Sequence, residues 1–223
     1  MAWGLAVTAL ASGVPAAAQV SFSVTLPQSA VSEPVTGRLI VITTRRPADG
    51  TPAKAEPRQM IGMNGPPAFG MDVENLRPGA TVTLDATSDG FPFGLDRLPA
   101  GDYSVQAVLV PYKKAKRADG HTIWVPMNDQ RVIAPMFPGN PYSKPADVRL
   151  DPAAKAPVAL TLTEKIGPIA REPDTPWIKR VRIKSKILSD FWGMPMYIGA
   201  EVLLPKDFDK HPAARYPAIY TDG

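Results

Sequence analysis

The sequence contains no cysteine among its 223 residues and only two histidines, His121 and His211. The missing cysteine excludes disulfides, cysteine zinc sites, a thiol nucleophile and lipid attachment through an N-terminal cysteine. We expect no bound metal or cofactor, because the two histidines would need carboxylates such as Asp85 or Asp89, whose spacing lacks the calcium-loop pattern. The 25 basic and 21 acidic side chains are dispersed and give a formal net charge of +4, so we expect no nucleic-acid partner.

Long stretches without proline are also missing. The chain has 26 prolines and 17 glycines, and its longest proline-free stretch is residues 177–194. Because proline lacks a backbone donor and clashes inside a helix, this distribution excludes a helical bundle. Hydrophobic residues make up 44% of the chain, which is enough to bury a sizeable core. We therefore predict a mainly β fold with long loops.

The N-terminal part of the sequence lacks charge: no charged side chain occurs before Glu33. Residues 2–14 form a short, alanine-rich apolar stretch that is followed by small residues. This pattern predicts a signal peptide at residues 1–18 and hence a secreted or periplasmic bacterial protein, although Met1 need not be the natural start. The alternatives are a buried strand or an uncleaved anchor. An anchor needs about 20 strongly apolar residues, so we expect no stable membrane span.

Alternating apolar and polar residues predict β-strands through the next part of the chain. The clearest are residues 20–26 and 103–110, and the second follows a Pro-Ala-Gly-Asp turn typical of small β-sandwiches. Further strands are predicted at residues 37–44, 80–86, 121–125 and 158–163. The proline-rich stretches 45–78 and 134–145 are predicted to be loops. Together these patterns predict an immunoglobulin-like β-sandwich over residues 19–166.

Residues 167–176 hold three prolines and are predicted to be a linker. Residues 180–187 then alternate almost without exception, with the basic side chains on one face. The basic residues are Arg180, Arg182, Lys184 and Lys186. This face fits an anion site or a sheet edge protected by charge, and we favour the edge. A turn at 189–193 and strands at 197–204 and 216–221 complete the prediction.

Three short patterns follow in order within residues 184–223. They are a strand ending in Leu204-Pro205, then Phe208-Asp209, then Tyr216-Pro217 and an apolar stretch that runs into Gly223. Their order and spacing resemble the opening of the esterase branch of the α/β-hydrolases, the group that includes enterochelin esterase and esterase D. The resemblance implies that residues 177–223 are the first strands of an incomplete α/β-hydrolase domain.

The resemblance further implies that the parent protein is a secreted carboxylic-ester hydrolase, cut before its nucleophile. In that fold the turn after the third strand supplies an oxyanion-hole N–H, which makes Asp222 and Gly223 the candidate oxyanion-loop positions. Family members often have His-Gly there, so Asp222 is a departure. The sequence contains no G-x-S-x-G. We therefore expect no catalysis by this chain alone. The resemblance implies that its partner is the missing C-terminal hydrolase segment. It also implies that the substrate of the parent protein is an ester.

Two alternatives stay open. One is a non-catalytic exported module that binds carbohydrate or the cell envelope, through the aromatic residues Trp124, Tyr142, Trp177 and Trp192. Aromatic residues in strands more often belong to a core. The other is a structural periplasmic protein whose last strands complete the sandwich. The two histidines and the basic cluster at 113–117 are predicted to be solvated, and Met60, Met63 and Met71 to fill gaps under a loop.

Overall fold

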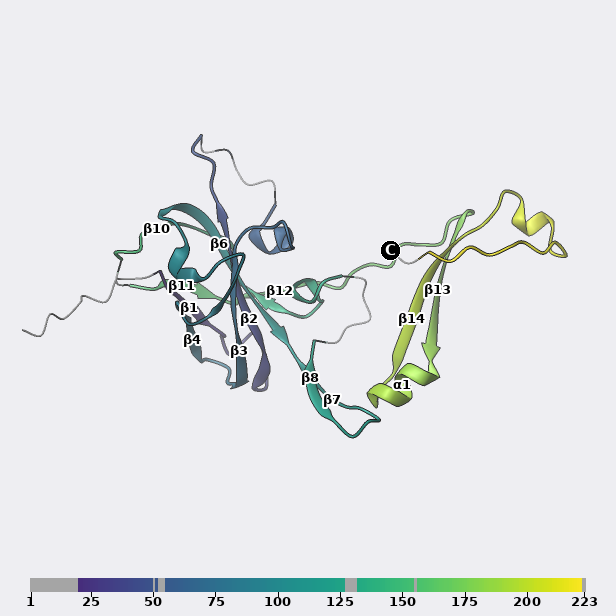
Figure 1. The fold of residues 1–223 in the computed structure, drawn as a ribbon, viewed down its shortest axis with the longest axis horizontal. Coiled ribbons are helices and arrows are strands. Elements are labelled where there is room, and N and C mark those ends of the chain that lie inside the picture. Colours follow the sequence, from purple (N-terminus) through teal and green to yellow (C-terminus); the bar gives the residue numbers. More distant parts are fainter. Residues whose placement is uncertain (1–19, 50, 52–54, 127–131, 155, 222–223) are drawn as a thin grey trace, which may run out of the picture. The chain divides into compact units, whose positions relative to one another are not determined.

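The computed structural model of the chain describes residues 20–49, 51, 55–126, 132–154 and 156–221. The fold is mainly β, as the sequence predicts (Figure 1). The chain divides into two compact units, of which one comprises Met1–Pro111 and Pro135–Ile166 and the other Tyr112–Ala134 and Gly167–Gly223. The predicted signal peptide at 1–18 lies outside the described residues. None of the described helices is long and apolar enough to cross a membrane.

Each unit has its own strands. Those of the first unit are β1 (Phe22–Thr25), β2 (Val35–Arg45), β3 (Ala68–Leu76), β4 (Thr81–Leu84), β5 (Asp89–Phe91), β6 (Gly101–Pro111), β9 (Pro141–Tyr142), β10 (Ala146–Leu150), β11 (Val158–Thr161) and β12 (Glu164–Lys165). Those of the second unit are β7 (Lys113–Lys116), β8 (Thr122–Val125), β13 (Ile178–Ser185) and β14 (Met196–Leu203), with the α-helix α1 (Lys186–Trp192). Short 3-10 helices are η1 (Pro57–Met60), η2 (Leu95–Arg97), η3 (Ala134–Met136) and η4 (Phe208–Lys210).

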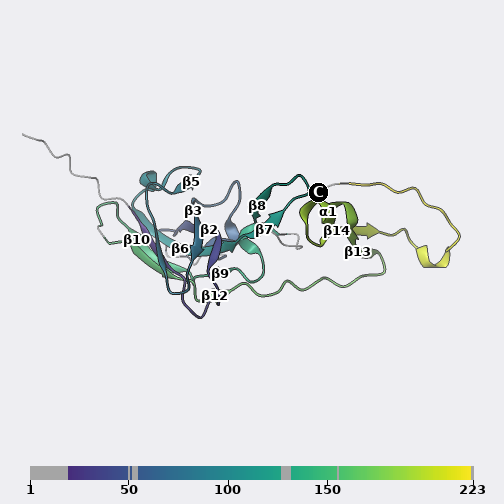
Figure 2. The same ribbon diagram turned by 90° about the horizontal axis from the view of Figure 1, so that it is seen from below.

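The first unit is built from two sheets. The smaller has the order β11-β1-β4, in which β1 runs parallel to β11 and antiparallel to β4. The larger has the order β12-β9-β6-β2-β3-β5, and β10 also pairs with β6. Figure 2 shows β10 beside β6 from below. Strands β2 and β6 are the long central pair of this sheet and run antiparallel along its middle.

One apolar core joins the two sheets. The alternation predicted for β1 places Phe22 and Val24 inward, where they are 0% and 1% exposed. They belong to the same buried cluster as Val41 of β2 and as Val105 and Leu109 of β6. Because each large apolar side chain contributes about 1.5–3 kcal/mol on burial, this shared core is the main stabilising element of the first unit.

Tyr103 ties the start of β6 to the preceding turn. Its ring is buried in the core, and its hydroxyl donates a hydrogen bond to the carbonyl oxygen of Pro99 at 2.9 Å. Gly101 lies between them with φ of +155°, a backbone conformation that side chains rarely adopt. The turn predicted before this strand is therefore fixed by one side-chain hydrogen bond.

The second unit contains two antiparallel pairs. β13 pairs with β14 from Ile178–Leu203 to Ser185–Met196, and α1 connects the two strands. The side chain of Ser185 caps α1 by accepting from the N–H of Leu188 at 3.2 Å. β7 and β8 form a hairpin that follows β6 directly in the chain.

Four predictions at the level of single elements are wrong. Within residues 134–145, predicted to be loop, Pro141–Tyr142 form β9, which pairs with β6 and β12. Residues 68–76, predicted to be loop, form β3, which pairs with β2 at the centre of the larger sheet. Residues 189–193, predicted to be a turn, belong largely to α1, which begins at Lys186. Residues 216–221 form no strand, because no neighbouring strand pairs with them in the described part of the chain.

We predict that Tyr103→Phe lowers the free energy of unfolding by about 1–2 kcal/mol, because it removes the hydroxyl and leaves the Pro99 carbonyl without its donor. Urea unfolding followed by far-UV circular dichroism measures this. Tyr142→Phe is the matched control and should cost less than about 0.5 kcal/mol. Equal effects of the two substitutions would contradict the proposed role of Tyr103.

Candidate functional site

The larger sheet of the first unit has a second buried face, which carries a polar network. Gln106 of β6 is 0% exposed and lies on the face opposite the shared core, since alternate residues of β6 enter that core. Its side-chain oxygen accepts from the N–H of Arg58 at 3.0 Å. Its amide donates to Ser143 O at 2.8 Å and to Glu56 Oε2 at 3.0 Å. All of these groups are therefore partnered, as buried polar groups require.

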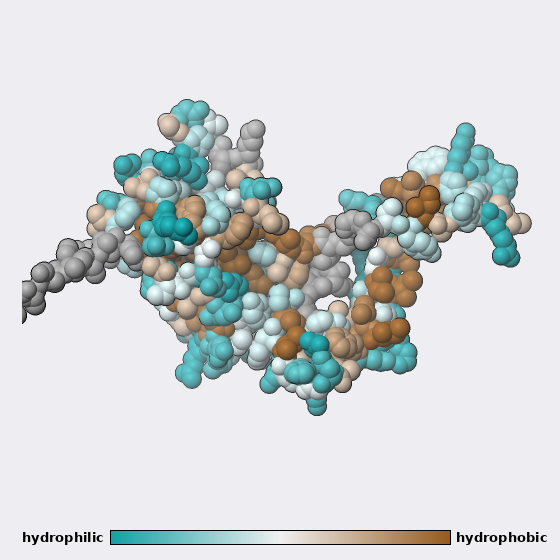
Figure 3. Space-filling model, in the orientation of Figure 1, coloured by the Kyte–Doolittle hydropathy of each residue, from teal (hydrophilic) through white to brown (hydrophobic). Residues whose placement is uncertain are grey.

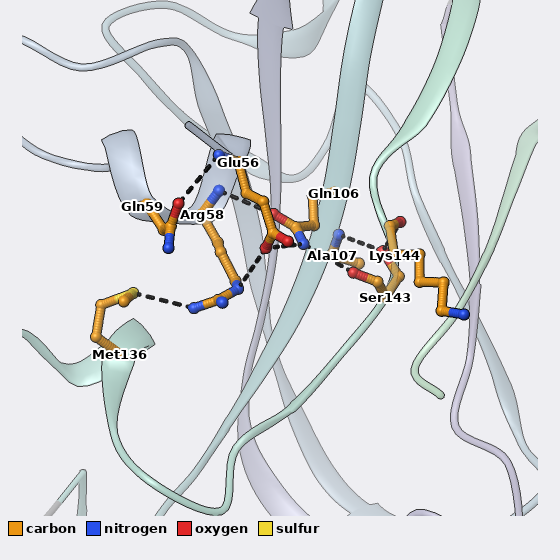
Figure 4. Close-up of polar contacts among 8 residues, drawn as sticks. All are labelled: Glu56, Arg58, Gln59, Gln106, Ala107, Met136, Ser143 and Lys144. Atoms are coloured by element: carbon orange, nitrogen blue, oxygen red, sulfur yellow. Dashed lines mark hydrogen bonds and ion pairs between the residues drawn. The ribbon is translucent and has the colours of Figure 1, made fainter. Parts of the chain in front are cut away.

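The segments that cover this face come from distant parts of the sequence. Glu56 directly precedes η1, and Ser143 directly follows β9. Figure 4 shows Gln106 between these two segments. Ser143 exchanges two bonds with Ala107 of β6, accepting through Oγ at 3.0 Å and donating its backbone N–H at 2.9 Å. The network thus attaches both covering segments to the central strand.

Arg58 brings a charge into this covered region and is only 9% exposed. Its Nε donates to Glu56 Oε2 at 3.0 Å, and its guanidinium carbon lies 4.3 Å from the centre of the Tyr142 ring. A further nitrogen of the guanidinium contacts the sulfur of Met136 at 3.5 Å. The Glu56 carboxylate is therefore held from two sides, by Arg58 and by Gln106.

Glu56 and Tyr142 also line an open depression of about 550 Å³. The other lining residues are Lys144, Pro145, Asp147 and Glu164. The lining offers carboxylate acceptors, one ammonium donor and an aromatic ring. These groups can bind a polar ligand through hydrogen bonds and ring contact.

The β13–β14 pair of the second unit has two unlike faces. On one face lie Val181, Ile183, Ile198 and Val202, which are 38%, 60%, 53% and 40% exposed. We call these four residues the apolar face of the β13–β14 pair. Brown, apolar atoms are visible over β14 and α1 in Figure 3. Apolar side chains that are this exposed and lie together mark a surface that binds another element.

The opposite face of this pair carries Arg180, Arg182 and Lys184, as the alternation predicts, whereas Lys186 belongs to α1 and pairs there with Asp190. Arg180 forms ion pairs with Glu172 and, at 3.6 Å, with Glu201, and it donates to Pro173 O at 2.6 Å. The guanidinium carbon of Arg182 lies 3.2 Å from the centre of the Tyr197 ring. These partners lie within the unit, which favours the structural interpretation of the basic face over an anion site.

The tip of the β7–β8 hairpin packs on α1. The backbone N–H of Ala118 donates to Phe191 O at 2.8 Å, and the guanidinium of Arg117 lies over the Phe191 ring at 4.8 Å. Figures 1 and 2 both show the hairpin next to α1. Arg117 also pairs with Asp119. Arg117 is therefore packed against a helix, unlike the solvated tip predicted from the sequence.

The predicted oxyanion-loop positions, Asp222 and Gly223, lie outside the described residues. Both histidines are exposed: His121 Nδ1 lies 3.3 Å from Asp119 Oδ1, and His211 lies after η4. In the part of the chain that the structure describes, no serine hydroxyl contacts either histidine. The described residues thus assemble no catalytic triad.

The carboxylates and methionines considered for metal binding have other partners. Asp89 pairs with Arg38 at 2.5 Å. Asp85 accepts the hydroxyl of Thr87 at 2.6 Å and its N–H at 2.9 Å, and these bonds lower the pKa of the Asp85 carboxyl. Met71 packs against the core, whereas Met60 and Met63 are 37% and 87% exposed, so gap filling was wrong for these two methionines. No cluster of three or more metal-ligating side chains occurs among the described residues.

The four aromatic residues proposed for sugar stacking fall in both units. Tyr142 belongs to the first unit, and the three tryptophans belong to the second. Trp124 and Trp177 are each 49% exposed, and Trp192 packs edge-on against Phe191. Among the residues of the network and the depression, only Tyr142 is a candidate from the sequence. The sequence does not identify Glu56, Arg58, Gln106 or Ser143 as site residues.

Comparisons with known proteins return no relatives. No protein-family model matches the chain, and neither the curated proteins nor the solved structures contain a match to it.

We predict that Gln106→Ala destabilises the protein by about 2–4 kcal/mol, because it leaves the Arg58 N–H and the Ser143 carbonyl without partners in a buried site. Chemical denaturation measures the change. Gln28→Ala is the control, since Gln28 is exposed and lies just after β1, outside the network; it should cost about 0.5 kcal/mol or less. A small effect of Gln106→Ala would show that the network contributes little.

Gly193→Ala should loosen the packing of the hairpin on α1. Gly193 has φ of +66°, and a Cβ there would lie 2.6 Å from the carbonyl oxygen of Lys116. We expect the amide proton of Ala118 to exchange with solvent at least about tenfold faster, as measured by NMR. Gly199→Ala is the control, because a Cβ at Gly199 would lie 3.9 Å from the nearest atom, the carbonyl oxygen of Val181, and would cause no clash. Unchanged exchange in Gly193→Ala would refute the contact.

Proposed function

We propose that the chain is the N-terminal part of an exported, esterase-like serine hydrolase, in which residues 19–166 form an accessory domain and residues 177–223 begin the hydrolase domain. The observation that carries this proposal is the apolar face of the β13–β14 pair, whose side chains are 38–60% exposed. A sheet with one apolar face needs a covering layer. In an α/β-hydrolase, crossover helices supply that layer.

The residues after β14 support the same proposal. Leu204-Pro205, Phe208-Asp209 and Tyr216-Pro217 follow in the order that resembles the opening of the esterases. The rings of Phe208 and Tyr216 lie 5.7 Å apart. Ile219 and Tyr220 are 90% and 92% exposed, which fits an apolar strand that requires neighbours in a larger sheet.

The accessory domain in this proposal is an immunoglobulin-like β-sandwich. The hydroxyl of Tyr103 bonds to the backbone four residues earlier, the arrangement known as a tyrosine corner in such domains. Its role would be to position the hydrolase domain or to cover part of the substrate entrance. Export through a signal peptide at residues 1–18 belongs to the same proposal.

The 223-residue chain should not hydrolyse a short-chain aryl ester above the rate of the heat-denatured protein, because its described residues assemble no triad. Release of the aryl alcohol, followed by absorbance, measures this. Ester hydrolysis that is abolished by a serine-directed phosphonate would contradict the prediction that this chain is catalytically inactive.

A longer chain, extended along the natural reading frame, should hydrolyse the same ester. We expect a G-x-S-x-G about 100 residues after Gly223, followed by an Asp and a His. Replacing that serine by alanine is the control and should abolish the activity. A reading frame without these residues would overturn the proposal.

A second candidate function is a non-catalytic module that binds glycans. One specific observation favours it: the depression of the first unit places the Tyr142 ring beside several carboxylates. The two functions are compatible, because an accessory domain can bind a ligand while another domain performs catalysis.

A further inference from the structure

The depression of the first unit is formed by segments that are far apart in the sequence. Glu56 precedes η1, Tyr142 belongs to β9, Asp147 to β10 and Glu164 to β12. These residues therefore lie at one edge of the larger sheet. There β9 and β10 both pair with β6, and β12 pairs with β9. Because regular strands carry most of these side chains, their spacing is set by the sheet.

Each carboxylate of the lining has its own cation. Glu56 Oε2 lies 3.0 Å from Arg58, and Glu164 Oε1 lies 3.8 Å from the Lys144 ammonium. Asp147 Oδ2 lies 3.5 Å from Arg46. Three acids are thus balanced by three bases, so a charged ligand would gain little net attraction. The carboxylate oxygens still have lone pairs free to accept hydrogen bonds from a neutral donor.

The depression also contains apolar ring surface. Tyr142 is half-buried, and the Arg58 guanidinium lies over one face of its ring, 4.3 Å from the ring centre, so a ligand would pack on the opposite face. Pro145 adds a second ring to the lining. An aromatic ring beside hydrogen-bond acceptors matches a ligand that has hydroxyl donors around an apolar C–H face.

Resting on the second candidate function, we propose that this depression binds a neutral saccharide, with a sugar ring packed on Tyr142 and its hydroxyls donating to Glu56, Asp147 and Glu164. Saccharides combine many hydroxyl donors with a C–H face, and they carry no charge that the balanced lining would reject. Gln106 and Arg58 already hold the Glu56 carboxylate in position. Binding therefore costs little reorganisation at that residue.

The test is a titration of the full chain with neutral oligosaccharides of glucose, xylose and N-acetylglucosamine, followed by ¹H–¹⁵N NMR. We expect at least one series to bind with a Kd of about 1 mM or tighter and to shift the amides of residues 56, 142–144 and 146–147. Tyr142→Ala should weaken that binding at least about tenfold. Trp124→Ala, which removes a 49% exposed aromatic ring of the second unit, should leave it unchanged.

Glu164→Gln supplies a second variant should Tyr142→Ala fail to fold, because it keeps the side-chain shape and removes only the carboxylate charge. It should weaken binding about threefold to tenfold. Absence of amide shifts at about 10 mM of every sugar, or binding that neither variant changes, would overturn the proposal. Preference for an anionic or cationic sugar over all neutral ones would also contradict it. Because the assay needs no hydrolase activity, its failure would leave the proposed esterase function standing.

Discussion

Strand β6 is buried on both faces, and the rest of the first unit depends on this constraint. One face supplies Val105 and Leu109 to the core that joins the two sheets. The other face places Gln106 where water cannot reach it, so the polypeptide must provide its hydrogen-bond partners. The segments of Arg58 and Ser143 provide them, and in doing so they bring Glu56 and Tyr142 to the depression. The candidate binding site is therefore a consequence of how the central strand is covered.

The second unit is organised on a different basis. None of its described residues belongs to the buried apolar cluster that stabilises the first unit. Its order rests on strand pairing, on the cap of α1 by Ser185, and on the contact of Arg117 and Ala118 with Phe191. Two paired strands without a packed face are marginally stable in water. This contrast is the physical reason for proposing that the unit is the beginning of a larger sheet.

The sequence predicted the elements whose side chains alternate and missed those that depend on distant neighbours. Alternation correctly placed Phe22 inward on β1 and separated Val181 from Arg180 on β13. β3 was missed because it follows a proline-rich stretch, although Phe69, Met71 and Val73 alternate with small or charged residues as a strand requires. The network around Gln106 could not be predicted, because alternation alone does not reveal that a segment 48 residues earlier covers that face. The sequence contains two local signals for α1, the N-cap residue Ser185 and the glycine at its C-terminal end, Gly193. They were interpreted as part of a turn.

The first unit buries an apolar core, whereas the apolar face of the β13–β14 pair is exposed. Hydrogen–deuterium exchange of the full chain, resolved by peptide with mass spectrometry, measures this difference. We expect amides of β2 and β6 to remain protected while those of β13 and β14 exchange at least about a hundredfold faster. Equal, strong protection of both units would mean that the apolar face is already covered and that the second unit needs no further layer.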